Sequence, residues 1–388
     1  MIAIYVHEIA ATGVVRNALA IAGRLAREGH GVDLVTALPG GHEAVPPGVR
    51  HTVLLAPARR SRAAEQLLAV AALRRHLAGG EAAIIVSAGN HGHATVWAAT
   101  RGLARPRRIY RISNDTVRAG THAPGTPIGR SLRAAMAGLI ARDAARLVLV
   151  SATLAARPCY ARAIADGRGT IIANGVDVAG ARIAAQAPPD HPWFDGEAPL
   201  IVAVGRLNRQ KNFATLIAAT ALLQRQVPAR LLILGGSRDG AREALAAQAA
   251  RLGVGDRVAL PGTVANVFAW MARADVFALP SWWEGSPNVL LEAIATGVPV
   301  VASRTAGNAA EILDHGRYGR LVDPADPQAL ADALALQLRP ATAIRPGDRA
   351  AAFDLAANLD RWAALAGELL ADAPPRRAGA IAALTPAG

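Results

Sequence analysis

Cysteine and aromatic residues are scarce in this sequence, and each shortage narrows what the protein can be. Cys159 is the only cysteine among 388 residues, so the chain cannot form an internal disulfide, and a zinc site built on cysteine and histidine has no support. Aromatic residues make up 4% of the chain, which argues against a protein that stacks nucleic-acid bases on rings. No apolar run reaches the roughly 18 residues that cross a bilayer, and the first residues lack the basic start of a signal peptide. We therefore expect a soluble or peripherally bound protein.

Lysine is also nearly absent, because 41 of the 42 basic residues are arginine and Lys211 is the single exception. Arginine carries a planar guanidinium, whereas lysine carries a compact ammonium on a flexible stem. One lysine kept in such a chain indicates a position where a point charge is needed.

The positive charge is concentrated in the first half of the chain. Up to residue 190 the sequence has 23 arginines against 11 acidic residues, whereas the remainder has 19 basic and 18 acidic residues. This asymmetry predicts contact with an anionic membrane surface or a phosphorylated acceptor. Arginines on solvated faces would produce the same asymmetry, so both interpretations stay open. The basic surface would include Arg59, Arg60, Arg62, Arg74, Arg75 and the segment from Arg105 to Arg111.

Hydrophobic residues make up 52% of the chain and charged residues 18%, which is ample for a packed core, and the length suits two domains. Short apolar runs alternate with longer helical patterns, which is typical of βαβ units and parallel sheets. The first series of expected strands is Ile2–Val6, Gly31–Thr36, Ala83–Ser87, Arg108–Ser113, Leu147–Ser151 and Thr170–Ala173. The second series is Leu200–Val204, Arg230–Leu234, Arg257–Leu260, Val276–Leu279 and Val298–Ala302.

A proline-rich stretch separates the two series and predicts an interdomain linker. We expect an acceptor domain over residues 1–186, a linker over 187–198 and a donor domain over 199–348. Residues 349–372 are expected to form a helix that crosses back to the first domain, and residues 373–388 a mobile tail. Two doubly wound domains joined in this way would leave a cleft between the carboxyl ends of their strands.

Two cations follow the first strand of the second series. Arg206 and Lys211 lie between this strand and a helix expected from Phe213, with Asn212 as its N-cap. Backbone N–H groups at a helix entrance favour anions, so the pair suits a diphosphate. The alternative is a solvated loop with ordinary surface charge.

Two acidic residues lie eight positions apart near Pro287. We expect Ser286 to cap the helix and Pro287 to be its first residue, with Glu284 in the preceding loop and Glu292 inside the helix. The neighbours of Glu292 are almost all apolar, so its carboxylate needs hydrogen-bond donors. Sugar hydroxyls would supply them, and a nearby arginine would do so equally well.

These motifs resemble the second-domain signature of the retaining GT-B glycosyltransferases, family 4 type. The resemblance runs through nearly the whole chain and is strongest from about Val150 to Pro324. It implies a GT-B fold, with two Rossmann-like doubly wound domains facing a central cleft. The motifs that carry it are Gly205-Arg206 with Lys211, Glu284-x7-Glu292, Ile172-Ala173-Asn174-Gly175-Val176-Asp177, Leu234-Gly235-Gly236, Leu260-Pro261-Gly262-Thr263 and Gly297-Val298-Pro299-Val300-Val301-Ala302.

The resemblance also implies roles for individual residues. Arg206 and Lys211 would hold the donor diphosphate, and Glu292 would accept hydrogen bonds from the ribose. Glu284 would position the transferred sugar, together with the backbone of Gly285, Ser286, Pro287 and Asn288. The backbone near Thr263 and Val264 would face the base, and Gly13 would let the first domain approach the donor.

The chain departs from the family pattern at Thr12, where the family often has glycine, and at Asn114, where it often has histidine. His91 and His93 follow another expected strand, and surface or structural roles are favoured over catalytic ones for both. The sequence contains no Asp-x-Asp pair, so a metal-dependent arrangement has no support and we expect neither metal nor cofactor. The resemblance implies front-face displacement with retention at the anomeric carbon.

We therefore expect a hexosyltransferase of the cytoplasm or of the inner face of the cell membrane. It would transfer a sugar from a nucleotide-diphosphate donor to a glycan or lipid-linked acceptor in cell-envelope or exopolysaccharide biosynthesis, without nucleic-acid partners. A non-transferring GT-B relative such as an epimerase is one alternative. A catalytically inactive protein that binds sugar nucleotides or glycans is another.

Overall fold

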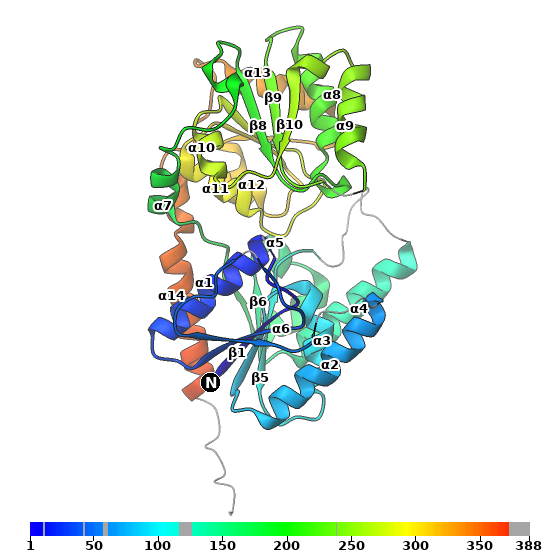
Figure 1. Cartoon of the computed structure of the whole chain (residues 1–388), viewed down its shortest axis with the longest axis vertical. Helices are drawn as coiled ribbons and strands as arrows, with labels where there is room; N and C mark the ends of the chain where they lie inside the picture. The colour runs from blue at the N-terminus through cyan, green and yellow to red at the C-terminus, as the bar shows by residue number, and fades with distance from the viewer. Residues whose placement is uncertain (11, 42, 57–60, 116–125, 238, 372–388) are drawn as a thin grey trace, which may run out of the picture.

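The chain folds into two α/β lobes stacked along the long axis of the molecule (Figure 1). The structure is a computed structural model that describes residues 1–10, 12–41, 43–56, 61–115, 126–237 and 239–371. The expected tail over residues 373–388 lies outside this range. Each lobe is built on one parallel sheet, so the expected fold class is confirmed.

The first lobe has a seven-stranded parallel sheet in the order β3-β2-β1-β4-β5-β6-β7. Its interior strand β1 is buried along its whole length, because helices cover both faces of a parallel sheet. The strands are β1 (Ile2–Val6), β2 (Val32–Thr36), β3 (Val49–Val53), β4 (Ile84–Ser87), β5 (Arg107–Ile112), β6 (Arg146–Leu149) and β7 (Gly169–Ile171).

The edge strand β3 was not expected, because its Val-Arg-His-Thr-Val sequence is largely polar. The structure supplies the reason for that polarity. Arg50 donates to the Asp33 carboxylate of β2 at 2.6 Å, and Thr52 donates to the same carboxylate at 2.8 Å. The polar residues of β3 thus neutralise a fully buried acid.

In the described part of the chain, seven α-helices pack on or follow the first sheet. Four of them are preceded by a threonine or serine whose side chain accepts from a backbone N–H of the first turn (Thr12, Ser61, Thr126 and Ser151). The helices are α1 (Gly13–Arg27), α2 (Arg62–Gly79), α3 (His93–Thr100), α4 (Pro127–Asp143), α5 (Ala152–Ala155), α6 (Ala161–Ala165) and α7 (Val178–Ala184). Helix α7 already packs on the second lobe, whose core includes Ala181, so the chain crosses over before the proline-rich stretch that begins at residue 187.

The second lobe has a six-stranded parallel sheet in the order β10-β9-β8-β11-β12-β13. Strands after β8 are added first on one side of it and then, from β11, on the other side. In doubly wound folds ligands bind at this switch point, which here lies between β8 and β11. The strands are β8 (Leu200–Val204), β9 (Arg230–Leu234), β10 (Val258–Gly262), β11 (Val276–Leu279), β12 (Val300–Ser303) and β13 (Arg320–Val322).

Two helix starts in the second lobe differ from expectation. Asn212 precedes α8 but adopts a left-handed conformation and makes no capping bond; its side-chain amide instead donates to the carbonyls of Pro280 and Pro324. Helix α11 begins at Asn288, with Pro287 in the capping position instead of the first turn. The helices are α8 (Phe213–Leu223), α9 (Ala241–Arg251), α10 (Val267–Ala272), α11 (Asn288–Thr296), α12 (Ala309–Ile312) and α13 (Pro327–Leu338).

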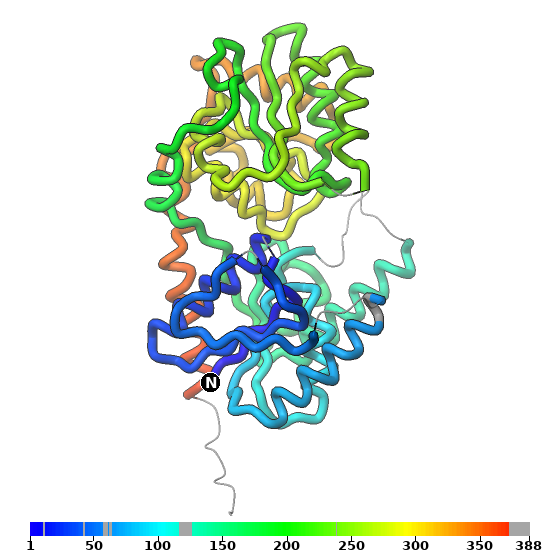
Figure 2. The backbone as a smooth tube through the Cα atoms, viewed as in Figure 1, coloured from blue at the N-terminus to red at the C-terminus, as the bar shows by residue number. Residues whose placement is uncertain are grey.

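The last helix, α14 (Leu355–Ala371), returns from the second lobe to the first (Figure 2). It packs along α1, and Leu359, Trp362 and Leu369 join the core that includes β1. The first lobe is therefore closed by residues that follow the second lobe in sequence. Among the described residues, none of the helices is both long enough and apolar enough to cross a bilayer.

Candidate functional site

The only lysine of the chain is held against one of the two predicted acids. Lys211 lies in a short 3-10 helix (Arg209–Lys211) after β8, and its Nζ lies 2.7 Å from Oε1 of Glu284. Gln210 donates to the other oxygen of Glu284 at 3.2 Å. Both members of the ion pair are largely buried, so the charges interact more strongly than on an open surface. The stem of Lys211 lies over Gly205, where an added Cβ would come within 2.8 Å of its Cε.

The second predicted acid, Glu292, pairs with an arginine from the other lobe. Nη2 of Arg16, in α1, lies 3.0 Å from Oε1 of Glu292. Glu292 is 7% exposed within the apolar helix α11, so the guanidinium supplies the partner that a buried carboxylate needs. An arginine partner was one of the two possibilities left open by the sequence, and Arg16 itself was not foreseen.

Loops at the carboxyl ends of both sheets touch at two further places. Gly285 packs so closely on the loop after β5 that an added Cβ would lie 2.5 Å from Cα of Asn114. Gly13, at the start of α1, packs in the same way on the side chain of Asn288, at the start of α11. Two helix N-termini, each with positive partial charge, therefore meet between the lobes.

A buried polar chain connects the first lobe to the loop before α11. Arg111 donates to Oδ1 of Asn174 at 2.6 Å, and Nδ2 of Asn174 donates to the carbonyl of Ser286 and to Oδ1 of Asn288. Arg111 is 3% exposed, and burial lowers its pKa to about 10. The expectation that Arg111 belongs to a basic surface is therefore wrong, because its guanidinium is buried and donates internal hydrogen bonds.

Other arginines of the predicted basic surface also have internal partners. Arg108 pairs with Asp143 at 2.9 Å, and Arg74 donates to the carbonyl of Arg101 at 2.6 Å. Arg59, Arg60 and the side chain of Arg62 lie outside the described residues.

The remaining predicted site residues lie at the rim of this region. The side chain of Arg206 is exposed and makes no hydrogen bond or ion pair with the described residues. Thr263 is exposed and adjoins Gly236, whose added Cβ would lie 3.5 Å from Oγ1 of Thr263. Val264 packs against the core of the second lobe. The structure therefore places Lys211 beside the loop of Glu284, Gly285 and Ser286. It leaves Arg206 and Thr263 exposed to solvent.

Four buried side-chain oxygens beyond or at the carboxyl ends of β11 and β12 have no hydrogen-bond partner among the described residues. A buried polar atom without a hydrogen-bond partner destabilises the fold. Two of the four oxygens belong to the segment after β11, one to the last residue of β12 and one to the segment after β12. The atoms are Oγ of Ser281, Ser286 and Ser303, and Oδ1 of Asn308. A bound molecule rich in hydroxyl or phosphate groups would provide partners for such atoms.

The two histidines differ in environment. His91 is exposed, whereas His93 is buried, with Nδ1 2.7 Å from Oγ of Ser87 and its ring edge-on to Tyr110. Burial lowers the pKa of His93 to about 3, so the ring is neutral at ordinary pH. This environment supports the structural role for His93. No group of three or more potential metal-ligating side chains occurs in the part of the chain that the structure describes.

Two parallel sheets whose carboxyl-end loops meet form the GT-B architecture. In comparisons with known proteins, the family described as "Glycosyl transferases group 1" matches residues 198–339, and the "Glycosyl transferase 4-like domain" matches residues 12–175. The chain belongs to the group 1 glycosyltransferase family.

Curated relatives share part of the sequence. A D-inositol 3-phosphate glycosyltransferase from Pseudarthrobacter chlorophenolicus is 36% identical over 208 residues, 52% of this chain and 49% of the relative. A GDP-mannose-dependent phosphatidylinositol monomannoside mannosyltransferase from Mycobacterium tuberculosis is 39% identical over 150 residues, 36% of this chain and 38% of the relative. The match to the first of these thus spans about half of that protein.

Solved structures share the fold over nearly the whole chain. Sucrose-phosphate synthase from Thermosynechococcus elongatus has a TM-score of 0.78 at 24% identity and covers 95% of this chain and 99% of that one. Anabaena HepE in complex with UDP and glucose has a TM-score of 0.74 at 20% identity and covers 96% and 99%. At such identities the likeness establishes the fold alone.

Proposed function

We propose that the protein is a retaining glycosyltransferase that moves a sugar from a nucleotide-diphosphate donor to a glycan or lipid-linked acceptor of the cell envelope. The observation that carries the proposal is the buried Lys211–Glu284 pair beside the meeting point of α1 and α11. A cation and two helix N-termini there suit a diphosphate. The activities of the relatives named above support the donor and acceptor classes.

In the proposed complex, Lys211 and Arg206 hold the diphosphate, and Lys211 stabilises the charge that grows on the leaving phosphate. The side chain of Arg206 is exposed and without a partner among the described residues, so it can turn towards the donor. Glu284, oriented by Lys211 and Gln210, positions the transferred sugar. The unsatisfied Oγ of Ser286 is a further polar group for a sugar hydroxyl or phosphate.

The proposed chemical step is a front-face displacement. The bond between the anomeric carbon and the phosphate oxygen breaks while the bond to the acceptor oxygen forms on the same face. The acceptor proton passes to the leaving phosphate oxygen, and the nucleoside diphosphate departs. The site residues supply electrostatic stabilisation and orientation, and no protein nucleophile is required. In retaining glycosidases two carboxylates share one sugar, whereas Glu284 is assigned here to the sugar and Glu292 to the ribose.

The test is a panel of sugar nucleotides, including GDP-mannose and UDP-glucose, screened by thermal shift and then assayed for transfer and product anomer. Lys211→Ala and Glu292→Ala should each reduce kcat/KM by about 30- to 1,000-fold, which corresponds to about 2–4 kcal/mol of lost transition-state stabilisation. Arg209→Ala, an exposed cation in the same 3-10 helix, is the matched control and should leave transfer unchanged. Inversion at the anomeric carbon would refute the retaining mechanism, and tight donor binding without turnover would favour an inactive binding protein.

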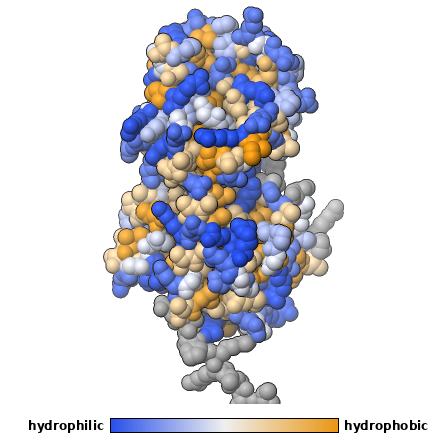
Figure 3. Space-filling model, turned by 90° about the vertical axis from the view of Figure 1, so that its left-hand side faces the viewer, coloured by the Kyte–Doolittle hydropathy of each residue, from blue (hydrophilic) through white to orange (hydrophobic). Residues whose placement is uncertain are grey.

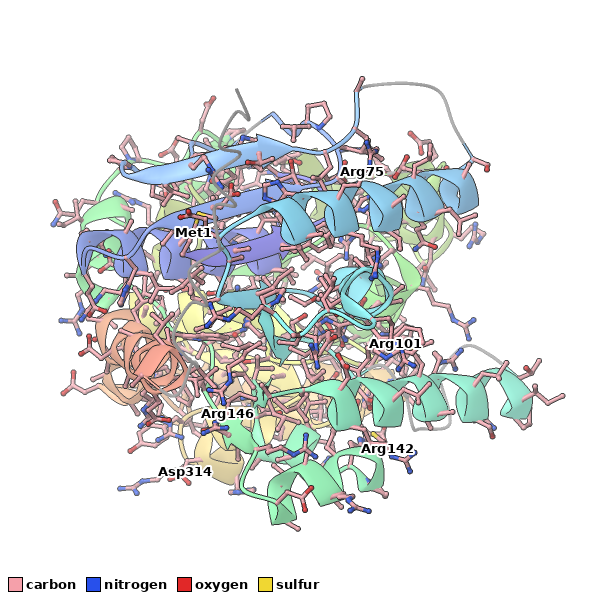
Figure 4. The ribbon with its side chains drawn as sticks, turned by 90° about the horizontal axis from the view of Figure 1, so that it is seen from below. Met1, Arg75, Arg101, Arg142, Arg146 and Asp314 are labelled. Carbon is pink, nitrogen blue, oxygen red and sulfur yellow. The ribbon has the colours of Figure 1, made fainter. Side chains whose placement is uncertain are left out.

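We further propose that the enzyme works at the inner face of the cell membrane, with α4 against anionic lipid. Four large apolar residues lie on one side of α4 at helical spacing, and all are exposed: Ile128, Leu132, Met136 and Leu139. The first two are 74% and 66% exposed. Figure 4 shows α4 and α2 extending to the same side of the first lobe, and α2 carries the exposed Leu67.

Cationic side chains accompany this apolar edge. A hollow of about 470 Å³ next to α4 is lined by Leu139 and by three arginines, Arg142, Arg162 and Arg168, which places guanidinium groups beside an apolar wall. Arginine next to exposed aliphatic side chains is the combination that binds anionic bilayers. On the face that carries α14, polar and apolar residues are interspersed over both lobes (Figure 3).

Vesicle sedimentation at low salt tests this placement. The wild-type protein should bind vesicles that contain phosphatidylglycerol more strongly than pure phosphatidylcholine vesicles, and the double variant Ile128→Gln, Leu132→Gln should lose most of that binding. The control is Ile183→Gln, because Ile183 is 70% exposed on α7. Equal binding by wild type and double variant would refute the placement. A wild-type dimer that the double variant dissociates would instead identify this edge as an interface between two copies.

A further inference from the structure

Arg16 occupies a position that helix stability does not explain. It lies in the first turn of α1, which contains no acidic residue. The N-terminal end of a helix carries positive partial charge, so a cation there is unfavourable. Its side chain is half-exposed and reaches out of the first lobe to Glu292 of the second lobe. The side chain therefore contributes a contact between the lobes and does not stabilise its own helix.

We propose that Arg16 is a gate on the donor site that competes with the donor ribose for the carboxylate of Glu292. The inference rests on the proposed function, in which Glu292 accepts hydrogen bonds from the ribose. In that function two ribose hydroxyls would engage both carboxylate oxygens, whereas in the structure Nη2 of Arg16 lies 3.0 Å from Oε1. Donor entry therefore exchanges one partner of a buried acid for another.

The exposure of the two side chains favours such an exchange. Glu292 is nearly buried and cannot be left unpaired without a large cost, so one partner must always be present. The side chain of Arg16 is half-exposed, so it can turn into water with little loss. A second consequence follows from its place on the other lobe: releasing Arg16 removes one of the contacts that hold the lobes together, at the time when the donor enters.

The competing residue should weaken donor binding, so its removal should strengthen it. Arg16→Met keeps the aliphatic length without the charge, and we expect the Kd of the best donor of the panel to fall two- to fivefold. A two- to fivefold change in Kd corresponds to about 0.4 to 1 kcal/mol of binding free energy. The melting temperature without donor should fall, because Glu292 loses its partner. Arg16→Lys should restore both values towards those of the wild type.

Isothermal titration calorimetry and thermal denaturation of the full chain give the two readouts. The control is Arg24→Met, because Arg24 lies on the same helix but pairs with Glu28 and Asp360, away from the site. A purely structural role for Arg16 would lower the melting temperature and leave the donor Kd unchanged, which would overturn the proposal. Weaker donor binding would also overturn it, since Arg16 would then assist the donor. A wild-type protein that binds no sugar nucleotide would refute the proposed function as well.

Discussion

A close approach between the lobes makes a sharp prediction for Gly285. An added Cβ at this position would lie 2.5 Å from Cα of Asn114, and closer still to the carbonyl oxygen of Ser113. A separation of 3.4 Å is the lower limit of ordinary contact, so Gly285→Ala must part the two backbones by at least about 0.9 Å. The contacts are with backbone, which cannot rotate away as a side chain would.

This displacement falls on the loop between Glu284 and the start of α11. Misplacing a catalytic group by about 1 Å can cost about 100-fold in rate, so we expect kcat/KM for transfer to fall by roughly that factor. The clash joins two loops and not a packed core, so the free energy of unfolding should change by less than about 1 kcal/mol.

The assay is steady-state transfer with the preferred donor, together with urea denaturation. Gly138→Ala is the matched control: it lies in α4, and an added Cβ there meets nothing within 4 Å. That substitution should keep full activity and raise stability by about 0.5–1 kcal/mol. Transfer by Gly285→Ala within threefold of wild type would refute the argument, because the lobes would then not need this contact for catalysis.

Three further predictions concern the first lobe and its link to the second. Burial lowers the pKa of His93 to about 3, so below about pH 6.5 the unfolded chain binds a proton that the folded chain does not. The free energy of unfolding should therefore decrease as the pH is lowered, and at pH 4.5 this decrease should reach about 2–3 kcal/mol. His93→Gln should remove this loss in urea denaturation at pH 7.5 and 4.5, and an unchanged loss would show that other groups cause it. Trp362→Ala should lower the free energy of unfolding by about 3–5 kcal/mol, because Trp362 is buried in the core of the first lobe; a loss under 1 kcal/mol would mean that α14 is not part of that core. Asn174→Ala should cost about 1–3 kcal/mol of stability, since it removes the amide acceptor of Arg111, and should also slow transfer, whereas unchanged transfer would show that the loop before α11 does not depend on it.

Much of the fold is predictable from the sequence, because buried parallel strands appear as short apolar runs. All eleven expected strands occur, with ends shifted by at most two residues. The two strands that were not expected lie at sheet edges. Strand β3 is polar and owes its place to the buried Asp33, and β13 has only three residues. Neither contains an apolar run long enough to predict a strand from the sequence alone.

The candidate site is predictable only where its residues are close in sequence. The spacing of Lys211, Glu284 and Glu292 together with the family resemblance identified those residues. The partners Arg16 and Asn174 come from the other lobe, more than a hundred residues away, and no spacing rule connects them to Glu292 or Asn288. Arg111 was predicted to be exposed because arginine usually is. Its burial depends on contacts in the tertiary structure that the sequence pattern does not show.

The path of α14 has a consequence for the order in which the chain can fold. During synthesis the first lobe leaves the ribosome with its seven strands complete, yet Leu359, Trp362 and Leu369, which complete its core, are made only after the whole second lobe. Until then apolar surface around β1 and α1 stays uncovered, and uncovered apolar surface invites aggregation or chaperone binding. The two lobes therefore mature together, and the nascent protein has no early, self-sufficient half.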